Sequence, residues 1–253
     1  MTKLLRLGTS SWSHESWRGS VYPHDSAPGD FLAHYARRYD AVEIDATWYR
    51  IPSESMVRKW ASVVPDGFVF AAKVPSAVTH DAPLAEAGPT LREFLRVMEG
   101  LGDRLGPLLL QFPYAFKPDQ FDVLAAFLAQ LPSDRRFAIE IRHKGWLSER
   151  FYDLLRKHRV SLALVDLVWM PKVDVLTADW AYVRFIGDRK GIEKKTKTWD
   201  RLIVDRSKET AEWVPRIRAI LERHMPVYAF FNNHYAGHAP GSLELFKKAM
   251  ELA

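Results

Sequence analysis

Cysteine is absent from the 253 residues of the chain. Disulfide bonds and thiolate metal sites are therefore excluded, and the lack of cysteine fits a reducing compartment. Long apolar runs are missing too: no stretch approaches the length of a membrane span, and the N-terminal MTKLLRLGTSSW lacks the apolar core of a signal peptide. The sequence thus predicts a cytoplasmic protein without a membrane segment.

Several catalytic signatures are also absent. The chain has no P-loop, no serine-nucleophile elbow and no Gly-rich dinucleotide fingerprint after its first apolar run. Its nine histidines form no HxH or HExxH pair. The formal net charge is only +5, a mild basic excess that suits nucleic acid or phosphorylated ligands but is equally common in ordinary enzymes.

The chain does contain eight short apolar runs. Several are almost continuously apolar, as expected of parallel strands that are covered on both faces. Most are followed by an amphipathic helical pattern, whereas the sixth connection, 167–180, contains Pro171 and no such pattern. The predicted strands are 4–9, 41–47, 68–74, 108–112, 137–141, 161–166, 181–186 and 227–233.

The helical segments between these runs complete the pattern. Ser53 is the predicted N-cap of one helix, and Thr90 with Glu93 three residues later forms a capping-box pattern at another. Eight strands that alternate with helices predict an α/β fold, a TIM (β/α)8-type barrel, as a single domain over 1–253 and irregular at the sixth connection. The predicted helices are 31–39, 53–64, 90–101, 119–131, 148–158, 208–224 and 241–253.

Charged and amide side chains stand at the carboxyl ends of the strands. Because side chains alternate along a strand, Glu43 and Asp45 point to one face, as do Glu140 and Arg142. In a barrel these strand ends meet at one rim, where the catalytic face lies. The strand-end set comprises Glu43, Asp45, Lys73, Gln111, Glu140, Arg142, Asp166, Arg184 and Asn232.

Two interpretations of this set stay open. It could be a salt-bridge network that merely fills the barrel, or a functional site, which we favour because apolar side chains fill a barrel without the cost of burying charge. In a rim of mixed charge the acidic and basic side chains neutralise each other, and Arg and Lys remain able to bind an anion. We therefore expect an anionic small-molecule or nucleic-acid ligand. A divalent metal is compatible with the sequence but not required, and no metal ligand is assigned.

Aromatic residues follow most strand ends, where they could stack on sugars or bases or simply pack the loops. Directly after the first strand, SSWSHESWRGSVYP (10–23) carries Trp12, which we expect to contact ligand, and Trp17 and Tyr22, which we expect to pack the loop down. After the seventh strand comes the basic segment DRKGIEKKTK (188–197), at a position where this fold commonly binds phosphate. It is either a solvated loop or a lid.

The chain resembles the YecE-like family, domain of unknown function 72, from end to end. The motifs that carry this resemblance are GTSSWSHESWRGSVYP, YDAVEIDATWYRIPS, FVFAAKVPSAVTH, LLLQFP, IEIRHKGW, YVRF and YAFFNNHYAGHAP. The resemblance implies a TIM barrel but no activity. The family's recurring positions fall on Trp12, Trp17, Tyr22, Pro23, Glu43, Tyr49, Lys73, His80, Gln111, Glu140, Arg142, Trp146, Asp166, Arg184, Asn232 and Asn233.

The resemblance also implies distant relationships to endonuclease IV-type nucleases and to sugar isomerases, both metal-dependent TIM barrels. Where those enzymes present several His, Asp and Glu ligands, this chain presents Lys73, Gln111, Arg142 and Arg184. That departure argues against a metal cluster of the same kind.

Three hypotheses follow. The first is a hydrolase-like enzyme on a phosphate-bearing substrate, such as a nucleic acid or a sugar or nucleotide phosphate. The second is a sugar isomerase or another carbohydrate enzyme, and the third a non-catalytic nucleic-acid-binding protein. The predicted catalytic residues are Glu43, Lys73, Glu140 and Asp166, and the predicted substrate-binding residues are Trp12, Tyr49, His80, Gln111, Arg142, Trp146, Arg184, Asn232 and Asn233. In the first hypothesis Glu43 or Glu140 acts as the general base, and Arg142, Arg184 and Lys73 hold the phosphate.

Overall fold

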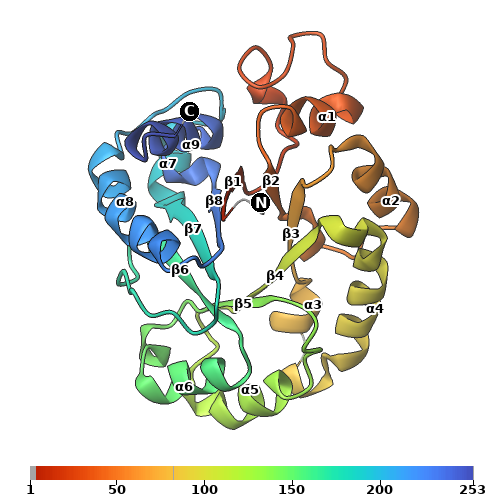
Figure 1. Cartoon of the computed structure of the whole chain (residues 1–253), viewed down its shortest axis with the longest axis vertical. Helices are drawn as coiled ribbons and strands as arrows, with labels where there is room; N and C mark the ends of the chain where they lie inside the picture. The colour runs from red at the N-terminus through yellow and green to blue at the C-terminus, as the bar shows by residue number, and fades with distance from the viewer. Residues whose placement is uncertain (1–3, 82, 253) are drawn as a thin grey trace.

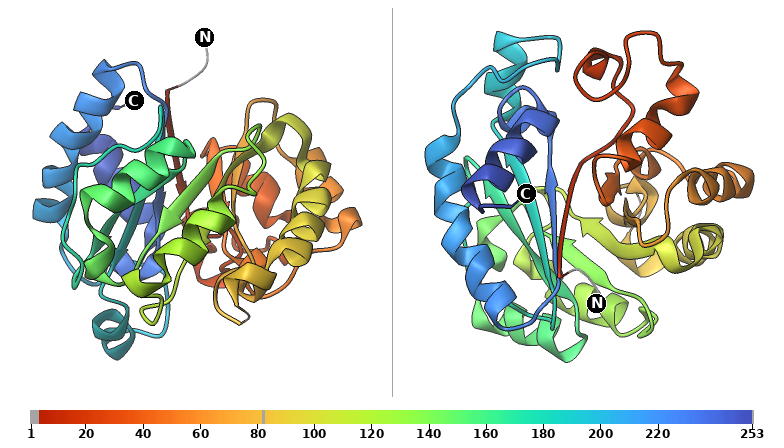
Figure 2. Two further views of the ribbon diagram at one scale, coloured as in Figure 1. Left: turned by 90° about the horizontal axis from the view of Figure 1, so that it is seen from below. Right: turned by 45° about the horizontal axis from the view of Figure 1, so that its top comes forward.

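Eight parallel strands form the centre of the computed structural model, which describes residues 4–81 and 83–252. They pair in the order β1-β8-β7-β6-β5-β4-β3-β2, and helices surround them (Figures 1 and 2). The predicted α/β TIM-type barrel is confirmed. The strands are β1 (Leu5–Thr9), β2 (Ala41–Ile44), β3 (Val69–Lys73), β4 (Leu105–Gln111), β5 (Phe137–Glu140), β6 (Ser161–Leu167), β7 (Ala181–Gly187) and β8 (Val227–Phe231).

The seven predicted helices lie close to their expected ranges, whereas the two short helices Ser76–Thr79 and Arg189–Lys195 were not predicted. The sixth connection contains no helix, as expected. The last helix begins two residues earlier than predicted, and residue 253 of that prediction lies outside the described residues. The helices are α1 (Phe31–Ala36), α2 (Glu54–Val63), α3 (Ser76–Thr79), α4 (Gly88–Met98), α5 (Phe121–Leu128), α6 (Glu149–Lys157), α7 (Arg189–Lys195), α8 (Ser207–Glu222) and α9 (Ala239–Ala249).

Two helix starts test the capping predictions. The Ser53 side chain accepts a hydrogen bond from the Met56 backbone N–H at 3.2 Å, which confirms Ser53 as the N-cap of α2. The capping box at Thr90 is wrong, because α4 already begins at Gly88 and Thr90 lies within its first turn.

The basic segment after β7 also differs from a simple loop. Most of it forms α7, which begins after Asp188, whose carboxylate accepts a hydrogen bond from the Gly191 backbone N–H at 3.0 Å. A carboxylate at a helix N-terminus is favourable because it satisfies an unpaired N–H. The basic side chains of this segment are therefore carried on an ordered helix.

The barrel has a seam between β1 and β2, where a single bridge, Ser10 to Glu43, joins the strands. Below that bridge the Tyr35 hydroxyl accepts a hydrogen bond from Thr9 N–H at 2.9 Å and donates one to the Ala41 carbonyl at 3.0 Å. A Cβ at Gly8 would lie 2.1 Å from the Ala41 carbonyl oxygen, so only glycine permits this approach. A side chain thus replaces the usual backbone ladder at the seam.

Apolar residues form two separate cores. The larger one lies between the strands and the helices and holds most of the buried Leu, Ile, Val and Phe side chains. The smaller one fills the barrel interior, where small alanine side chains and large aromatic side chains pack together. The interior set includes Ala41, Ala71, Leu109, Ala138, Ala163, Val165, Tyr182, Tyr228 and Phe230.

Membrane insertion can be assessed for the helices of the described residues. None of them is both long enough and apolar enough to cross a bilayer.

Candidate functional site

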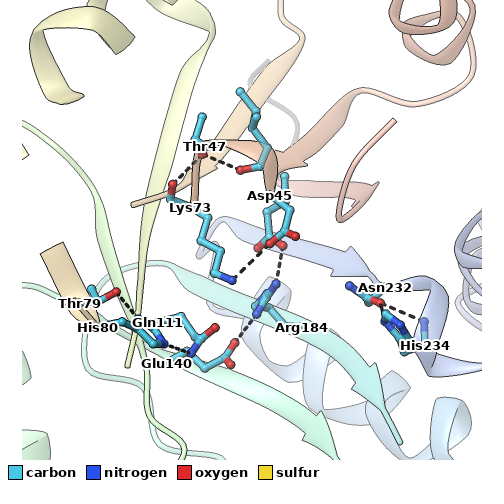
Figure 3. A network of polar contacts seen from close by, with 12 residues as sticks. Asp45, Thr47, Lys73, Thr79, His80, Gln111, Glu140, Arg184, Asn232 and His234 are labelled. Atoms are coloured by element: carbon cyan, nitrogen blue, oxygen red, sulfur yellow. Dashed lines mark hydrogen bonds and ion pairs between the residues drawn. The ribbon is translucent and has the colours of Figure 1, made fainter. Parts of the chain in front are cut away.

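A buried charge network crosses the barrel directly above its apolar interior. Arg184 of β7 donates from Nη2 to Glu43 Oε1 of β2 and from Nη1 to Glu140 Oε2 of β5, both at 2.6 Å. The Tyr182 hydroxyl donates to the second oxygen of Glu43 at 2.6 Å. All four side chains are buried, so strands from opposite sides of the barrel are joined by charge-assisted hydrogen bonds (Figure 3).

Arg142 extends this network towards solvent. Its Nη2 lies 2.5 Å from Glu140 Oε1, and its guanidinium lies 5.8 Å from the Trp169 ring. Burial would raise the pKa of the Glu140 carboxyl, but Arg142 and Arg184 outweigh it and lower the pKa to about 2. Glu140 is therefore ionised at neutral pH and serves as a poor proton acceptor.

Lys73, at the end of β3, forms a second ion pair beside the network. Its Nζ lies 3.3 Å from Asp45 Oδ1 (Figure 3). It also lies 4.6 Å from the centre of the ring of Trp48, in the 3-10 helix Ala46–Trp48. Thr47 donates its hydroxyl hydrogen bond to the Lys73 carbonyl at 2.6 Å and so fixes the strand end. Burial lowers the pKa of the Lys73 ammonium, and the Asp45 carboxylate offsets part of that shift.

Gln111 and His80 lie next to Lys73 at the mouth of the barrel. Gln111 Nε2 lies 3.4 Å from His80 Nε2, and His80 Nδ1 lies 2.8 Å from the Thr79 hydroxyl (Figure 3). Burial, followed by the charge of Lys73, lowers the pKa of His80, so this imidazole is neutral at pH 7.

The mouth of the barrel encloses a pocket of about 470 Å³, the cationic pocket. Five cationic and two acidic side chains line it, and α7 supplies part of one wall. Trp169 and Tyr49 are half or more exposed at its rim. Its lining residues are Asp45, Tyr49, Lys73, Gln111, Arg142, Leu167, Trp169, Arg184, Ile186, Asp188, Arg189, Lys190, Asn232 and His234.

A second pocket, of about 240 Å³, adjoins the first; we call it the polar pocket. The two share Asp45, Tyr49, Asn232 and His234. Its walls come from the first loop, the end of β2 and the loop after β8. The residues that line it are Ser10, Ser11, His14, Asp45, Ala46, Tyr49, Trp199, Asn232, Asn233 and His234.

Most of the predicted site residues meet at this mouth. Glu43 and Glu140 lie beneath the cationic pocket, and His80 contacts Gln111 beside it. Asn233 lines the polar pocket, where its Oδ1 also accepts a hydrogen bond from the Ala239 backbone N–H at 2.9 Å. The other predicted residues that line the cationic pocket are Tyr49, Lys73, Gln111, Arg142, Arg184 and Asn232.

Asp166 lies elsewhere, and its expected place with the other acids is wrong. Its carboxylate faces the helix layer, where Oδ2 accepts hydrogen bonds from Trp213 Nε1 at 2.8 Å and from the Tyr235 hydroxyl at 3.2 Å. The reason is strand alternation: Val165 and Leu167 point into the barrel, so Asp166 between them points out.

Two tryptophans are also displaced from the expected ligand surface. Trp146 is buried, donates from Nε1 to the Phe116 carbonyl at 2.8 Å and stacks on the Phe116 ring. Trp12 packs edge-on against Trp60, with ring centres 5.4 Å apart, and lines neither pocket. Trp17 of the same loop is buried, as predicted.

Several contributors were not assigned to the site from the sequence, among them Ser10, His14, His234, Tyr182 and Trp199. Tyr182 lies two residues before Arg184 on one strand, so alternation placed both in the interior and could have revealed it. Trp199 comes from the irregular segment after α7, where no periodic pattern indicates which way a side chain points.

In the described part of the chain, 4–81 and 83–252, no group of three or more His, Asp or Glu side chains is arranged to hold a metal ion. The donor set at the mouth, rich in Arg and Lys, therefore suits an anion better than a cation.

Comparison with known proteins identifies relatives along the whole chain. A family model described as "Protein of unknown function DUF72" matches residues 6–253. The UPF0759 protein YecE of Escherichia coli K12 is 32% identical over 147 residues, which are 58% of this chain and about half, 51%, of YecE. The UPF0759 protein YunF of Bacillus subtilis is 24% identical over 93% of this chain and 91% of YunF.

Solved structures show the same architecture. A DUF72 family protein of Thermotoga maritima, TM1631, has a TM-score of 0.82 and 30% identity, covering 98% of this chain and all of that one. A DUF72 family protein of Enterococcus faecalis, EF0366, has a TM-score of 0.79 at 24% identity, covering 99% and 98% of the two chains, a likeness of fold alone.

Proposed function

The chain belongs to the DUF72 family, whose description names no activity, and from the geometry of its mouth we propose an enzyme that acts on a phosphate-bearing substrate. One observation carries the proposal: buried carboxylates hold guanidinium groups beneath a pocket lined by five cations. Such preorganised positive charge stabilises the oxygens of a transferring phosphoryl group. We place the phosphate between Arg142, Lys73 and the first turn of α7.

Hydrolysis is the reaction class that this set of residues supports best. Phosphoryl transfer to water requires mainly positioning and charge stabilisation, and needs no covalent nucleophile from the protein. Water would attack phosphorus as the bond to the leaving oxygen breaks. Arg142 would bind the phosphate, Lys73 would donate a proton to the leaving oxygen, and the proton lost by the water would pass to a phosphate oxygen of the product. Asp45, 3.3 Å from Lys73, would orient that ammonium.

Glu43 and Glu140 take a different role in this proposal from that expected from the sequence. Arg184 binds both carboxylates. The Glu140 carboxyl, with a pKa of about 2, is in addition unsuited to remove a proton at neutral pH. We assign them as positioning residues that fix Arg184 and Arg142. Asp166, which faces away from the mouth, has no part in the reaction.

The test is turnover of a panel of phosphate mono- and diesters by the purified protein, with kcat/KM measured for each. Arg142→Gln should reduce kcat/KM at least about 100-fold, because it removes a group that binds transition-state charge. The matched control is Arg150→Gln on the exposed outer face of α6, which should retain full activity. Equal activity of the Arg142 variant and wild type would refute the assignment, and no turnover of any ester would refute hydrolysis.

A second candidate rests on the buried amine of Lys73 within the pocket. After passing a proton to Asp45, Lys73 Nζ could attack a substrate carbonyl carbon, and loss of water would form an imine. This chemistry would suit a carbohydrate enzyme. Borohydride with a sugar carbonyl compound should then leave a stable adduct on Lys73, detectable by mass spectrometry, and its absence would remove this candidate.

A further inference from the structure

The polar pocket beside the cationic pocket differs from it in chemistry. Five Lys and Arg side chains line the cationic pocket, whereas the described residues that line the polar pocket include neither residue type. The polar pocket is lined instead by hydroxyl, amide and imidazole groups, together with the rings of Tyr49 and Trp199. Two adjoining pockets of such different composition fit a ligand with two chemically different parts.

Ser10 is the residue of the polar pocket whose unsatisfied hydroxyl points to a ligand. Its side chain is more than nine-tenths buried in the pocket wall, and its Oγ has no hydrogen-bond partner among the residues that the structure describes. A buried hydroxyl without a partner is costly unless something else satisfies it. A ligand hydroxyl in the polar pocket would do so.

The imidazole of His14 in the same pocket suits a hydroxyl group. Burial, with the charge of His234, lowers the pKa of His14 to about 4, so this imidazole is neutral at pH 7. A neutral imidazole offers one donor and one acceptor, the combination that a sugar hydroxyl matches. The aromatic faces of Tyr49 and Trp199 match the apolar face of a sugar ring.

We propose that the polar pocket binds the sugar ring of a sugar phosphate whose phosphate lies in the cationic pocket. This inference rests on the proposed function and names its substrate class. The volume of about 240 Å³ holds a single sugar ring, and the shared wall of Asp45, Asn232 and His234 lets one ligand occupy both pockets. The sugar phosphate is either a free small molecule or a unit of a nucleic acid strand.

The experiment measures calorimetric affinities of the whole chain for inorganic phosphate, D-ribose, D-ribose 5-phosphate and a short single-stranded oligonucleotide. Ribose 5-phosphate should bind at least ten-fold more tightly than inorganic phosphate. Ser10→Val should remove that advantage and leave the phosphate affinity unchanged. Ser13→Val, an exposed serine of the same loop, is the matched control and should bind as wild type.

A second variant covers the case in which Ser10→Val fails to fold, as judged by circular dichroism. Trp199→Ala should weaken ribose 5-phosphate several-fold and leave inorganic phosphate unchanged. Tighter binding of the oligonucleotide, lost in the same variants, would support the proposal with a nucleic acid as the source of the sugar phosphate.

Other outcomes separate the two proposals. If wild type binds ribose 5-phosphate no more tightly than phosphate, the sugar pocket is overturned and the phosphate function stands. If ribose binds as tightly as ribose 5-phosphate while phosphate does not bind, the sugar pocket stands and the phosphate function fails. If none of the four probes binds, both are overturned.

Discussion

The barrel interior is built differently at its two levels, although the same strands form both. On β2 the interior residue is Ala41 at the lower level and Glu43 at the upper, and on β5 it is Ala138 and then Glu140. The lower level is filled by apolar side chains without any cost of burying charge. The upper level could have been filled in the same way, so its charges support the role proposed above for the mouth of the barrel.

The largest expected effect comes from breaking the charge network at its centre. Arg184→Met leaves Glu43 and Glu140 buried without the guanidinium that joins them and should lower the free energy of unfolding by about 3–5 kcal/mol. Urea denaturation measures this change. The triple variant Glu43→Gln, Glu140→Gln, Arg184→Met should recover most of the stability but no activity; a triple variant as unstable as the single one would contradict the comparison of the two levels.

Lowering the pH should destabilise the upper, charged level of the barrel interior before the lower, apolar level. The pKa of Glu140 is about 2 in the folded protein against an ordinary value of 4.5, so its contribution is complete above pH 4.5 and is lost as the pH falls towards 2. The loss amounts to about 3 kcal/mol. Urea denaturation across this range should show a slope for wild type that Glu140→Gln reduces; identical slopes would contradict the assignment.

A smaller difference in unfolding free energy is expected between variants of two tyrosines in the barrel interior. Tyr182→Phe removes a hydrogen bond to the buried carboxylate of Glu43 and should cost about 2 kcal/mol of unfolding free energy. Tyr228→Phe, in the apolar level, removes only a partly exposed contact with Arg136 and should cost less than about 1 kcal/mol. Equal losses in thermal or urea unfolding would show that the two levels are energetically alike.

The smallest effect on stability is expected at the outer rim. Lys190→Gln on exposed α7 should change the unfolding free energy by less than about 0.5 kcal/mol. It should still weaken phosphate binding several-fold at low salt and less at high salt, because exposed charges are screened. A salt-independent affinity loss would argue against a purely electrostatic contribution from α7.

Much of the fold could be read from the sequence because its signals are local. Each apolar run became a strand, and Ser53 caps α2 as its position before the helical pattern indicates. The capping box at Thr90 failed because Gly88 and Pro89 extend the helix backwards, with proline suited to a first turn. The basic segment became α7 although its charges, without an apolar face, gave no amphipathic pattern.

The site was harder to predict because it depends on which way each side chain points. Glu43, Glu140 and Arg184 could be placed inside the barrel by alternation, and they meet there. Asp166 could not, because the polar end of a strand covered on both faces does not reveal its direction. The sequence does not distinguish a tryptophan that packs in the core from one that contacts a ligand. For Trp146, the packing of its ring on Phe116 shows that it belongs to the core.

The seam at Tyr35 links the stability of the barrel to the spacing of its two pockets. Ser10, in the polar pocket, and Glu43, beneath the cationic pocket, lie opposite each other directly above the joint that the Tyr35 hydroxyl closes. A joint held mainly by side chains, here Tyr35 together with Asp40, which accepts a hydrogen bond from the Leu7 backbone N–H at 3.4 Å, opens more readily than a continuous backbone ladder. Local opening of the barrel would therefore begin where the two pockets meet, and hydrogen exchange at the Thr9 backbone amide would detect it.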